Sequence, residues 1–216
     1  MSTAAETFDV VVIGAGGAGM AAALTAAKQG LSTVLIEKSP YWGGSTSRSG
    51  GGVWIPNNSV LQRDGVTDTP EAAREYAHAI IGDVVSADRI DTYIERGPEA
   101  LDFLIANSPL KLEWVKDYSD YYPEAPGGRS HGRSCEPKPF NGKKLGEDLK
   151  TIHPPYAKAP LNVAVMQSDF RWLSTGFRHW RGPVKMAKVG ARTVWANITR
   201  KNLLVMGRAL TAELLI

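Results

Sequence analysis

Glycines at a fixed spacing near the start of the chain form its first candidate site. Gly14, Gly16 and Gly19 fill the positions of a G-x-G-x-x-G pattern within GAGGAG, which also contains Gly17. In this pattern the first glycine permits a tight turn, and the second lets the backbone approach a pyrophosphate. The third lets a helix pack closely against a strand. The spacing therefore predicts a site for the phosphates of a dinucleotide.

An acidic residue follows at the distance that such a site requires. Glu37 lies 18 residues after Gly19 and is followed by Lys38. A carboxylate at this point can accept hydrogen bonds from both ribose hydroxyls of an adenosine with a free 2′-OH. We therefore predict that Glu37 and Lys38 contribute to cofactor binding, against the alternative that the glycines form only a structural turn.

A second glycine-rich run, GGSTSRSGGG, occupies residues 43–52. Its backbone N–H groups and hydroxyls can line a pyrophosphate, a ribityl chain and a flavin ring. A flexible surface linker is the alternative, but the apolar residues Trp42 and Val53 on either side do not suit it. The run therefore favours FAD over NAD. Its predicted cofactor-binding residues are Gly43, Gly44, Ser45, Thr46, Ser49, Gly50 and Gly51.

Residues 8–38 must form a β-α-β unit to bring these groups together. The β-branched residues 8–14 predict a strand buried on both faces, and residues 32–38 predict a second, parallel strand. Between them a helix is expected from Gly17 to Lys28, with Gly30 at its C-terminal cap. The fold class is α/β, a Rossmann-like FAD-binding domain, in which a flavin and pyrophosphate loop over 39–58 follows the β-α-β unit.

The remainder, residues 69–216, is predicted to consist of helices and loops without an internal repeat. A helix is expected over 69–81, because Thr69 suits the N-cap and Pro70 suits the first helical position. The later expected elements are a helix from near Ser86, a separate helix from Pro98 to about Asn107, a strand over 110–115 and a functional loop over 118–140.

Charge and composition limit the classes of partner. The net charge is +3, divided into −8 over residues 1–128 and +11 over 129–216, a pattern that two facing halves explain without nucleic acid. Residues 10–27 are uncharged, but their glycines favour strand, turn and helix over a transmembrane segment. The four histidines lack the spacing of metal ligands, so no metal site is expected.

The single cysteine and the N-terminus indicate the compartment. Cys135 cannot form an internal disulfide, suits a reducing environment and is expected to be a bystander. No basic segment precedes the first apolar run, so a secretory signal is not expected. We therefore expect a cytoplasmic protein.

A family resemblance rests on both glycine runs and on later segments. Residues 10–38, which contain GAGGAG, and GGSTSRSGGGVWIPNN resemble the flavoprotein superfamily of succinate dehydrogenase and fumarate reductase. Within it the chain resembles the branch of 3-ketosteroid Δ1-dehydrogenases, for which SDYYPE at 119–124 is the distinguishing segment. The likeness to this branch continues through residues 72–83, 117–128, 132–140 and 188–196. The likeness extends over nearly the whole chain.

The resemblance implies a reaction and one catalytic residue. In this branch FAD accepts a hydride from C1 of a 3-ketosteroid while a base removes a proton from C2. The sequence does not identify the final electron acceptor. The first tyrosine of the Asp-Tyr-Tyr run lies in the active site, which makes Tyr121 the catalytic candidate and leaves Tyr118 and Tyr122 for packing. Since no histidine occurs before His78, non-covalent FAD is expected.

The resemblance also carries an expectation about extent. Family members are well over twice as long, so residues 1–216 are expected to be the N-terminal part of an FAD-binding domain without the catalytic cap domain. Such a part would have open sheet edges and no steroid-dehydrogenating activity by itself. Two alternatives remain: a related flavoprotein that desaturates another steroid position or reduces an activated C=C bond, and a non-catalytic nucleotide-binding remnant.

Overall fold

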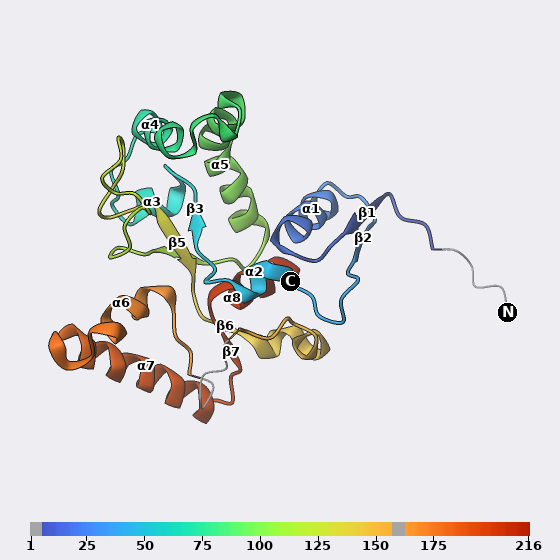
Figure 1. Cartoon of the computed structure of the whole chain (residues 1–216). Coiled ribbons are helices and arrows are strands. Elements are labelled where there is room, and N and C mark those ends of the chain that lie inside the picture. Colours follow the sequence, from blue (N-terminus) through green and yellow to red (C-terminus); the bar gives the residue numbers. More distant parts are fainter. Residues whose placement is uncertain (1–5, 157–162) are drawn as a thin grey trace.

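The structure, a computed structural model, describes residues 6–156 and 163–216 (Figure 1). Residues 1–5, where the expectation about a secretory signal begins, lie outside this part. The helices are α1 (Gly17–Lys28), α2 (Gly44–Arg48), α3 (Ser59–Arg63), α4 (Pro70–Ile81), α5 (Ala87–Asn107), α6 (Gln167–Thr175), α7 (Arg181–Ile198) and α8 (Met206–Leu215). The strands are β1 (Val10–Ile13), β2 (Thr33–Ile36), β3 (Val53–Trp54), β4 (Leu112–Trp114), β5 (Ser134–Pro137), β6 (Phe140–Asn141) and β7 (Leu203–Leu204). The 3₁₀ segments are η1 (Gly82–Val84), η2 (Gly142–Lys150) and η4 (Gly176–Arg178).

The β-α-β unit at the N-terminal end is confirmed. β1 and β2 are parallel, with Val10 opposite Thr33 and Ile13 opposite Ile36. α1 begins and ends where the sequence predicts, and Gly30 has the left-handed φ of 84° that follows a helix C-terminus.

The expectation that β1 is buried on both faces is wrong. Val11 and Ile13 are 54% and 85% exposed, and Ile36 of β2 is 48% exposed on the same two-stranded sheet. Within the described residues, α1 packs on one face of this sheet and nothing covers the other. A β-branched run predicts a strand, but it does not determine how many layers cover the strand.

Of the helices expected after the glycine runs, the one over 69–81 is confirmed as α4, and the next two are not separate helices. Thr69 caps α4, with its Oγ1 accepting from Ala72 N at 3.1 Å. The two helices expected on either side of Pro98 form one helix, α5. Its buried residues continue across the proline at helical spacing, so packing against the core outweighs the hydrogen bond that proline removes. These buried residues are Ile90, Ile94, Gly97 and Leu101.

Both predicted loops contain regular structure. The segment 39–58 holds the short helix α2 and the strand β3, so it is not one long loop. The expected loop over 118–140 ends early, because β5 begins at Ser134 and pairs with β3 and β4 in an antiparallel three-stranded sheet. The polar and small residues of both segments predicted loops. Strands β3 and β5 form there because each pairs with a strand that is distant in the sequence.

The core is organised around α8, which lies in the middle of the molecule beside α2 (Figure 1). Ala209 and Ala212 of this helix are fully buried, and Gly207 packs against α2. A second, smaller cluster joins α4 to α5 through Ala73, Ala77, Ile90 and Ile94. The two clusters together fix the glycine runs relative to the later tyrosine-rich segment.

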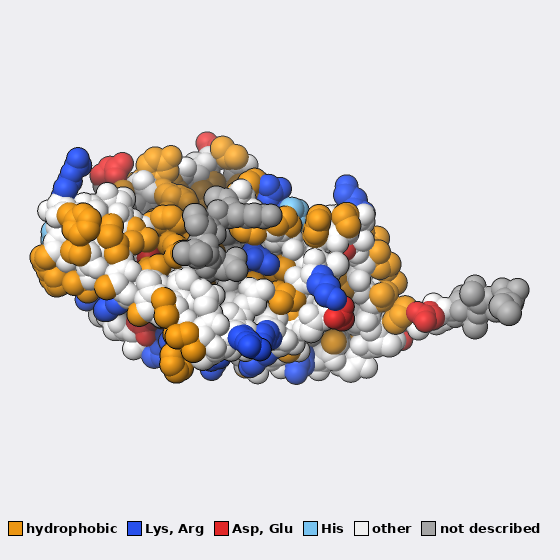
Figure 2. All heavy atoms as spheres, turned by 90° about the horizontal axis from the view of Figure 1, so that it is seen from below, with side chains coloured by type: hydrophobic (Ala, Val, Ile, Leu, Met, Phe, Trp, Pro, Cys, Tyr) orange, Lys and Arg blue, Asp and Glu red, His pale blue; other side chains and the backbone are white. Residues whose placement is uncertain are grey.

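Helices α6 and α7 pack against each other and project from the rest of the molecule (Figure 1). Figure 2 shows hydrophobic side chains on this part of the surface, at the left of the view, with Lys and Arg nearby. The exposed hydrophobic residues of this helix pair are Phe170, Phe177, Trp180, Val184, Met186, Val194, Trp195 and Ile198.

Candidate functional site

The first glycine run has the backbone geometry of a phosphate-binding turn. Gly14 has a φ of 102°, which an L side chain rarely adopts, and its N–H donates to Ile36 O at 2.7 Å. A Cβ on Gly19 would lie 1.8 Å from Gly14 O, so only glycine lets α1 pack this closely on the turn. The roles expected of the first and third glycines in the fold are confirmed.

The second glycine of the pattern leaves open space at the start of α1. Gly16 is the N-cap of α1, which has no side-chain cap. Outside its chain neighbours, no described heavy atom lies within 4 Å of a Cβ built on Gly16. A helix N-terminus with room in front of it suits a phosphate, because the helix dipole and its N–H groups favour an anion.

The two glycine runs lie against each other although 24 residues separate Gly19 from Gly43. Gly43 N donates to Ala15 O at 2.8 Å, and Gly17 N donates to Thr46 Oγ1 at 3.1 Å. A Cβ on Gly44 would lie 3.3 Å from Gly16 Cα. The runs therefore form one continuous backbone surface rather than two separate sites.

Glu37 closes the side of this surface at the end of β2. Its two carboxylate oxygens accept from Ser39 N and Ala15 N, both at 2.9 Å, and these backbone hydrogen bonds lower the pKa of the carboxyl. Each oxygen retains a lone pair for a further donor such as a ribose hydroxyl. The neighbouring Lys38 is exposed.

The other predicted residues of the second run divide into two groups. Ser45 and Gly50 are exposed. Gly43 and Gly51 are buried, and a Cβ on Gly51 would lie 2.5 Å from the Met206 carbonyl carbon. Ser49 also takes part in packing, because its carbonyl oxygen accepts from Gly207 N at 3.1 Å. Part of this run therefore serves to seat α8 beneath the candidate cofactor surface.

Two cavities adjoin the end of the second run. One, of about 750 Å³, is lined by Ser49, Gly50 and Gly51, and by residues of α6. The other, of about 520 Å³, has largely apolar and aromatic walls from β3, α4 and α5, including Trp54, Tyr76 and Tyr93. The walls that both cavities share are Gly52, Tyr118, Ser119, Tyr121 and Gln167. Sequence reasoning missed Gly52, although it is the last residue of the second glycine run, and Gln167, for which no motif gave a signal.

Tyr121 lies at the junction of the two cavities. Its side chain is 82% exposed, and its ring meets the Tyr118 ring edge to face with centroids 6.4 Å apart. Burial raises the pKa of the Tyr118 phenol, and the neighbouring Tyr121 adds to the effect. Tyr118 lines both cavities and Tyr122 is 55% exposed, so the expectation that these two residues serve for packing stays a prediction.

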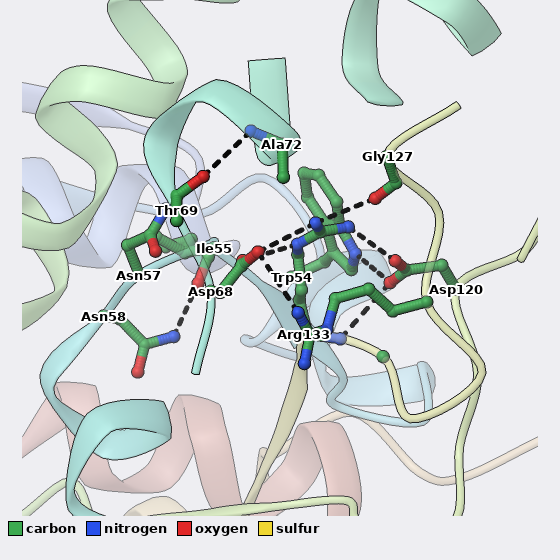
Figure 3. A network of polar contacts seen from close by, with 12 residues as sticks. Trp54, Ile55, Asn57, Asn58, Asp68, Thr69, Ala72, Asp120, Gly127 and Arg133 are labelled. Carbon is green, nitrogen blue, oxygen red and sulfur yellow. Dashed lines mark hydrogen bonds and ion pairs between the residues drawn. The ribbon is translucent and has the colours of Figure 1, made fainter. Parts of the chain in front are cut away.

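A buried ion network supports the segment that carries Tyr121 (Figure 3). Arg133 is fully buried and contacts Asp68 and Asp120, with N···O distances of 2.6 Å to each. Asp120 also accepts from Trp54 Nε1 at 2.9 Å. The sequence analysis did not single out these residues, because 65 positions separate Asp68 from Arg133.

Other reactive groups of the described residues do not form a second site. Burial raises the pKa of the Cys135 thiol to about 11, which keeps it protonated at neutral pH and unsuited to nucleophilic attack. Across residues 6–156 and 163–216, no group of three or more His, Cys, Asp or Glu side chains could hold a metal ion. In the same part of the chain, no helix is both long and apolar enough to span a bilayer.

Curated relatives share most of this sequence. The chain is 62% identical over 209 residues to the 3-oxosteroid 1-dehydrogenases of Mycolicibacterium smegmatis and Mycobacterium tuberculosis. The alignments cover 97% of this chain but only 37% of each relative. The chain thus spans little more than a third of the length of these relatives.

A solved structure shares the fold. The crystal structure of 3-ketosteroid Δ1-dehydrogenase from Sterolibacterium denitrificans, in complex with 1,4-androstadiene-3,17-dione, matches with a TM-score of 0.83 at 29% identity. The match covers 97% of this chain and 38% of that chain.

The site geometry and the family model agree on the cofactor. The open space at Gly16, at the start of α1, and the carboxylate of Glu37 fit the pyrophosphate and ribose of FAD. The model of the FAD-binding domain matches residues 9–215. The chain therefore belongs to the family of FAD-binding domains, and FAD is its cofactor.

Proposed function

We propose that the protein to which this chain belongs is an FAD-dependent 3-ketosteroid Δ1-dehydrogenase, which introduces a C1–C2 double bond. One observation carries the proposal: Tyr121 and the end of the second glycine run, Ser49–Gly52, line the same cavity. A flavin held along that run would therefore face the phenol that the resemblance assigns to the active site. The 62% identity to 3-oxosteroid 1-dehydrogenases favours this reaction over desaturation at another ring position.

The cofactor-binding part of the proposal assigns a task to each group. The start of α1, with the space at Gly16, would hold the pyrophosphate, and Glu37 would accept the ribose hydroxyls. Exposed Ser45 and Gly50 are available to the rest of the cofactor, and exposed Lys38 could add a positive charge near its phosphates. Bound FAD would supply the two-electron acceptor for the hydride that leaves C1.

Tyr121 is the proposed catalytic residue of this chain. Loss of a hydride from C1 must be balanced by loss of a proton from C2, and the C3 carbonyl acidifies that C–H bond. A tyrosine hydroxyl is a hydrogen-bond donor, so Tyr121 can donate a hydrogen bond to the group that removes the proton. Its exposed position at the cavity junction leaves its hydroxyl accessible to substrate.

The substrate proposal rests on the second cavity. Its volume of about 520 Å³ lies in the range of sites for small molecules, and its walls are largely aromatic and aliphatic. Such walls suit a rigid hydrocarbon skeleton with few polar groups. The similar Sterolibacterium denitrificans structure holds a steroid dione, which supports the same class of ligand here.

The experiment uses the complete protein with androst-4-ene-3,17-dione and a dye as electron acceptor. We expect the flavin absorbance to bleach on mixing, and the product to carry a 1,2 double bond by NMR. A double bond at another position would contradict this proposal and support the alternative, a related flavoprotein that desaturates another steroid position. Absence of any flavin after purification would favour the non-catalytic remnant.

The mode of FAD binding is tested on the same preparation. We propose that FAD is bound non-covalently, because no histidine precedes His78 and the flavin therefore cannot be attached to a histidine near the glycine runs. Acid precipitation should release the flavin into the supernatant. Flavin that remains with the precipitated protein would contradict this part of the proposal.

A cytoplasmic location, suggested by the single cysteine, remains part of the same proposal.

A further inference from the structure

The tyrosine loop, defined as residues 118–133, ends at a fully buried guanidinium. Arg133 Nε and Nη2 donate to the two carboxylate oxygens of Asp68 at 2.6 and 2.9 Å, and its Nη1 donates to Asp120 Oδ2 at 2.6 Å. Nη2 also donates to Gly127 O at 2.9 Å. Figure 3 shows these groups converging on Arg133 from the loop and from the turn before α4.

The charges of this network balance. Two carboxylates, Asp68 and Asp120, face Arg133, and a second cation lies within reach because Arg129 Nη1 is 3.6 Å from Asp68 Oδ1. The side chains of Arg133 and Asp120 are 0% exposed and that of Asp68 is 2% exposed. Buried charges tolerate little displacement, because each loses favourable interactions as soon as its partner moves. The network therefore has one strongly favoured arrangement.

This arrangement fixes the backbone on both sides of Tyr121. On one side, Asp120 Oδ1 accepts from Trp54 Nε1 at 2.9 Å and from Arg133 N at 3.2 Å. On the other side, Tyr122 N donates to the hydroxyl of Tyr76 at 3.2 Å. Tyr121 is thus held between two anchored residues while its own ring extends into the cavities.

The same guanidinium lies near both aromatic anchors. Its central carbon is 5.5 Å from the Tyr76 ring centroid and 5.9 Å from that of Trp54, within the range of cation–π attraction. Trp54 and Tyr76 both line the apolar cavity. A displacement of Arg133 would therefore shift Trp54 and Tyr76 in the cavity wall as well as Asp120.

Close packing leaves the loop no alternative path. A Cβ on Gly132 would lie 2.5 Å from Asp120 N, and a Cβ on Gly127 would lie 2.2 Å from Ala72 O in α4. Gly127 also has a φ of 69°. The loop is therefore seated directly on α4, with glycine at the points of closest approach.

We propose that Asp120 and Arg133 are positioning residues that hold the Tyr121 phenol at the junction of the two cavities. Asp120 lies in the wall of the apolar cavity, but its side chain is fully buried and its carboxylate is turned to Arg133 and Trp54. The network therefore acts on Tyr121 through the backbone that Asp120 and Tyr121 share. The expected effect of this positioning on the reaction rests on the proposed function. The expected rigidity of the segment around Tyr121 does not depend on it.

The kinetic test compares Asp120→Asn with Asp68→Asn in the complete flavoprotein. Each variant removes one carboxylate charge from Arg133, but only Asp120 is joined directly to Tyr121. We expect Asp120→Asn to slow flavin reduction by a 3-ketosteroid about 10- to 100-fold, the scale of a misplaced catalytic group. Asp68→Asn should slow flavin reduction clearly less than Asp120→Asn, because Asp68 reaches Tyr121 only through Arg133, although both variants lose thermal stability.

A double-mutant cycle separates positioning from general damage. In a Tyr121→Phe background, Asp120→Asn should cause less than about a threefold further loss, because both changes act on the same hydroxyl. Equal losses in the two backgrounds would overturn the proposal, as would equal slowing by Asp68→Asn and Asp120→Asn. If Asp120→Asn does not fold, Trp54→Phe removes the indole donor to Asp120 together with part of the cavity wall. Its test is therefore whether its effect on flavin reduction shrinks in the Tyr121→Phe background, and equal losses in the two backgrounds would overturn the proposal.

Amide hydrogen exchange tests the structural consequence without any steroid. Asp120→Asn should accelerate exchange at the Tyr121 and Tyr122 amides about tenfold or more, and Asp68→Asn should accelerate it clearly less. This result would stand even if the unmodified protein oxidised no steroid, which would refute only the proposed function. Unchanged exchange in Asp120→Asn would overturn the positioning role, whatever the activity.

Discussion

The first glycine run and the tyrosine loop both present groups to a candidate ligand, but they are held in different ways. Around Gly14 and Gly19 the geometry comes from backbone conformation and from the absence of a Cβ at these glycines. Around Tyr121 it comes from charged and aromatic side chains that meet from β3, α4 and the loop itself.

This difference determines which kind of change each region tolerates. The glycine run has no side chain larger than a methyl group, so it should fail when an atom is added at its point of closest approach, Gly19. The tyrosine loop has an extended supporting network, so it should fail when a charge or a hydroxyl is removed. The following substitutions test this contrast, from the largest expected effect to the smallest.

Removal of the Tyr121 hydroxyl should have the largest effect. In the complete protein, Tyr121→Phe should slow flavin reduction by a 3-ketosteroid about 10²- to 10⁴-fold, the range of a lost acid–base group. Steroid binding should change little, because the ring remains. Stopped-flow bleaching of the flavin measures the step. Tyr122→Phe, also on an exposed ring, is the matched control, and a similar loss in both variants would show that the Tyr121 hydroxyl has no special role.

Addition of one methyl group should damage the glycine run. Gly19→Ala should lower the free energy of unfolding by about 1–3 kcal/mol, because the new Cβ would meet Gly14 O. Gly190→Ala in α7 is the matched control. A Cβ at Gly190 meets no described atom within 4 Å outside its own helix backbone, so stability should rise by about 0.5–1 kcal/mol. Urea unfolding of both variants measures the difference, and equal effects would contradict the packing argument.

Glu213 is a buried carboxylate like Asp120, but no arginine pairs with it in the described residues. Glu213 in α8 is 4% exposed, and burial raises the pKa of its carboxyl from 4.5 to about 7. A raised carboxyl pKa means that the folded state favours the protonated form. Stability is therefore lost as pH rises from about 4.5 to about 7 and does not fall further above that range.

Glu213→Gln should remove this pH dependence. We expect the variant to be more stable by about 1–2 kcal/mol at pH 8 and nearly unchanged at pH 4. Thermal unfolding across the pH range measures both values. The matched variant Asp120→Asn should lose stability at pH 8, because it breaks an ion pair rather than removing an uncompensated charge. A loss of stability at pH 8 in Glu213→Gln would show that its carboxylate is better satisfied than the geometry indicates.

Neutralisation of Glu37 should have the smallest effect, on cofactor affinity alone. Glu37→Gln should weaken FAD binding about tenfold, because it loses charge-assisted hydrogen bonds to the ribose. Titration of apoprotein with FAD measures this, with exposed Glu147→Gln as control. Since backbone hydrogen bonds lower the pKa of Glu37, its carboxylate persists at pH 4.5, and affinity should fall only at still lower pH. An unchanged dissociation constant in Glu37→Gln would refute the ribose assignment.

The sequence predicted best where a structural requirement is local. The bounds of α1, the left-handed Gly30 and the Thr69 cap each depend on a few neighbouring residues, and each is confirmed. The prediction failed at Pro98, because a local helix breaker is outweighed by an apolar face that extends on both sides of it. It also failed at β1, where burial depends on layers that the strand itself does not specify.

The sequence by itself determined the β-α-β unit and its family, because glycine spacing and strand composition act within about thirty residues. The tertiary structure alone decided that the two glycine runs form one surface, and that Tyr121 lies where their end meets the cavities. It also brought Asp68, Asp120 and Arg133 together. An ion network carries no spacing signal, since its members meet only after the chain has folded, and the stability of each buried charge then depends on its partners.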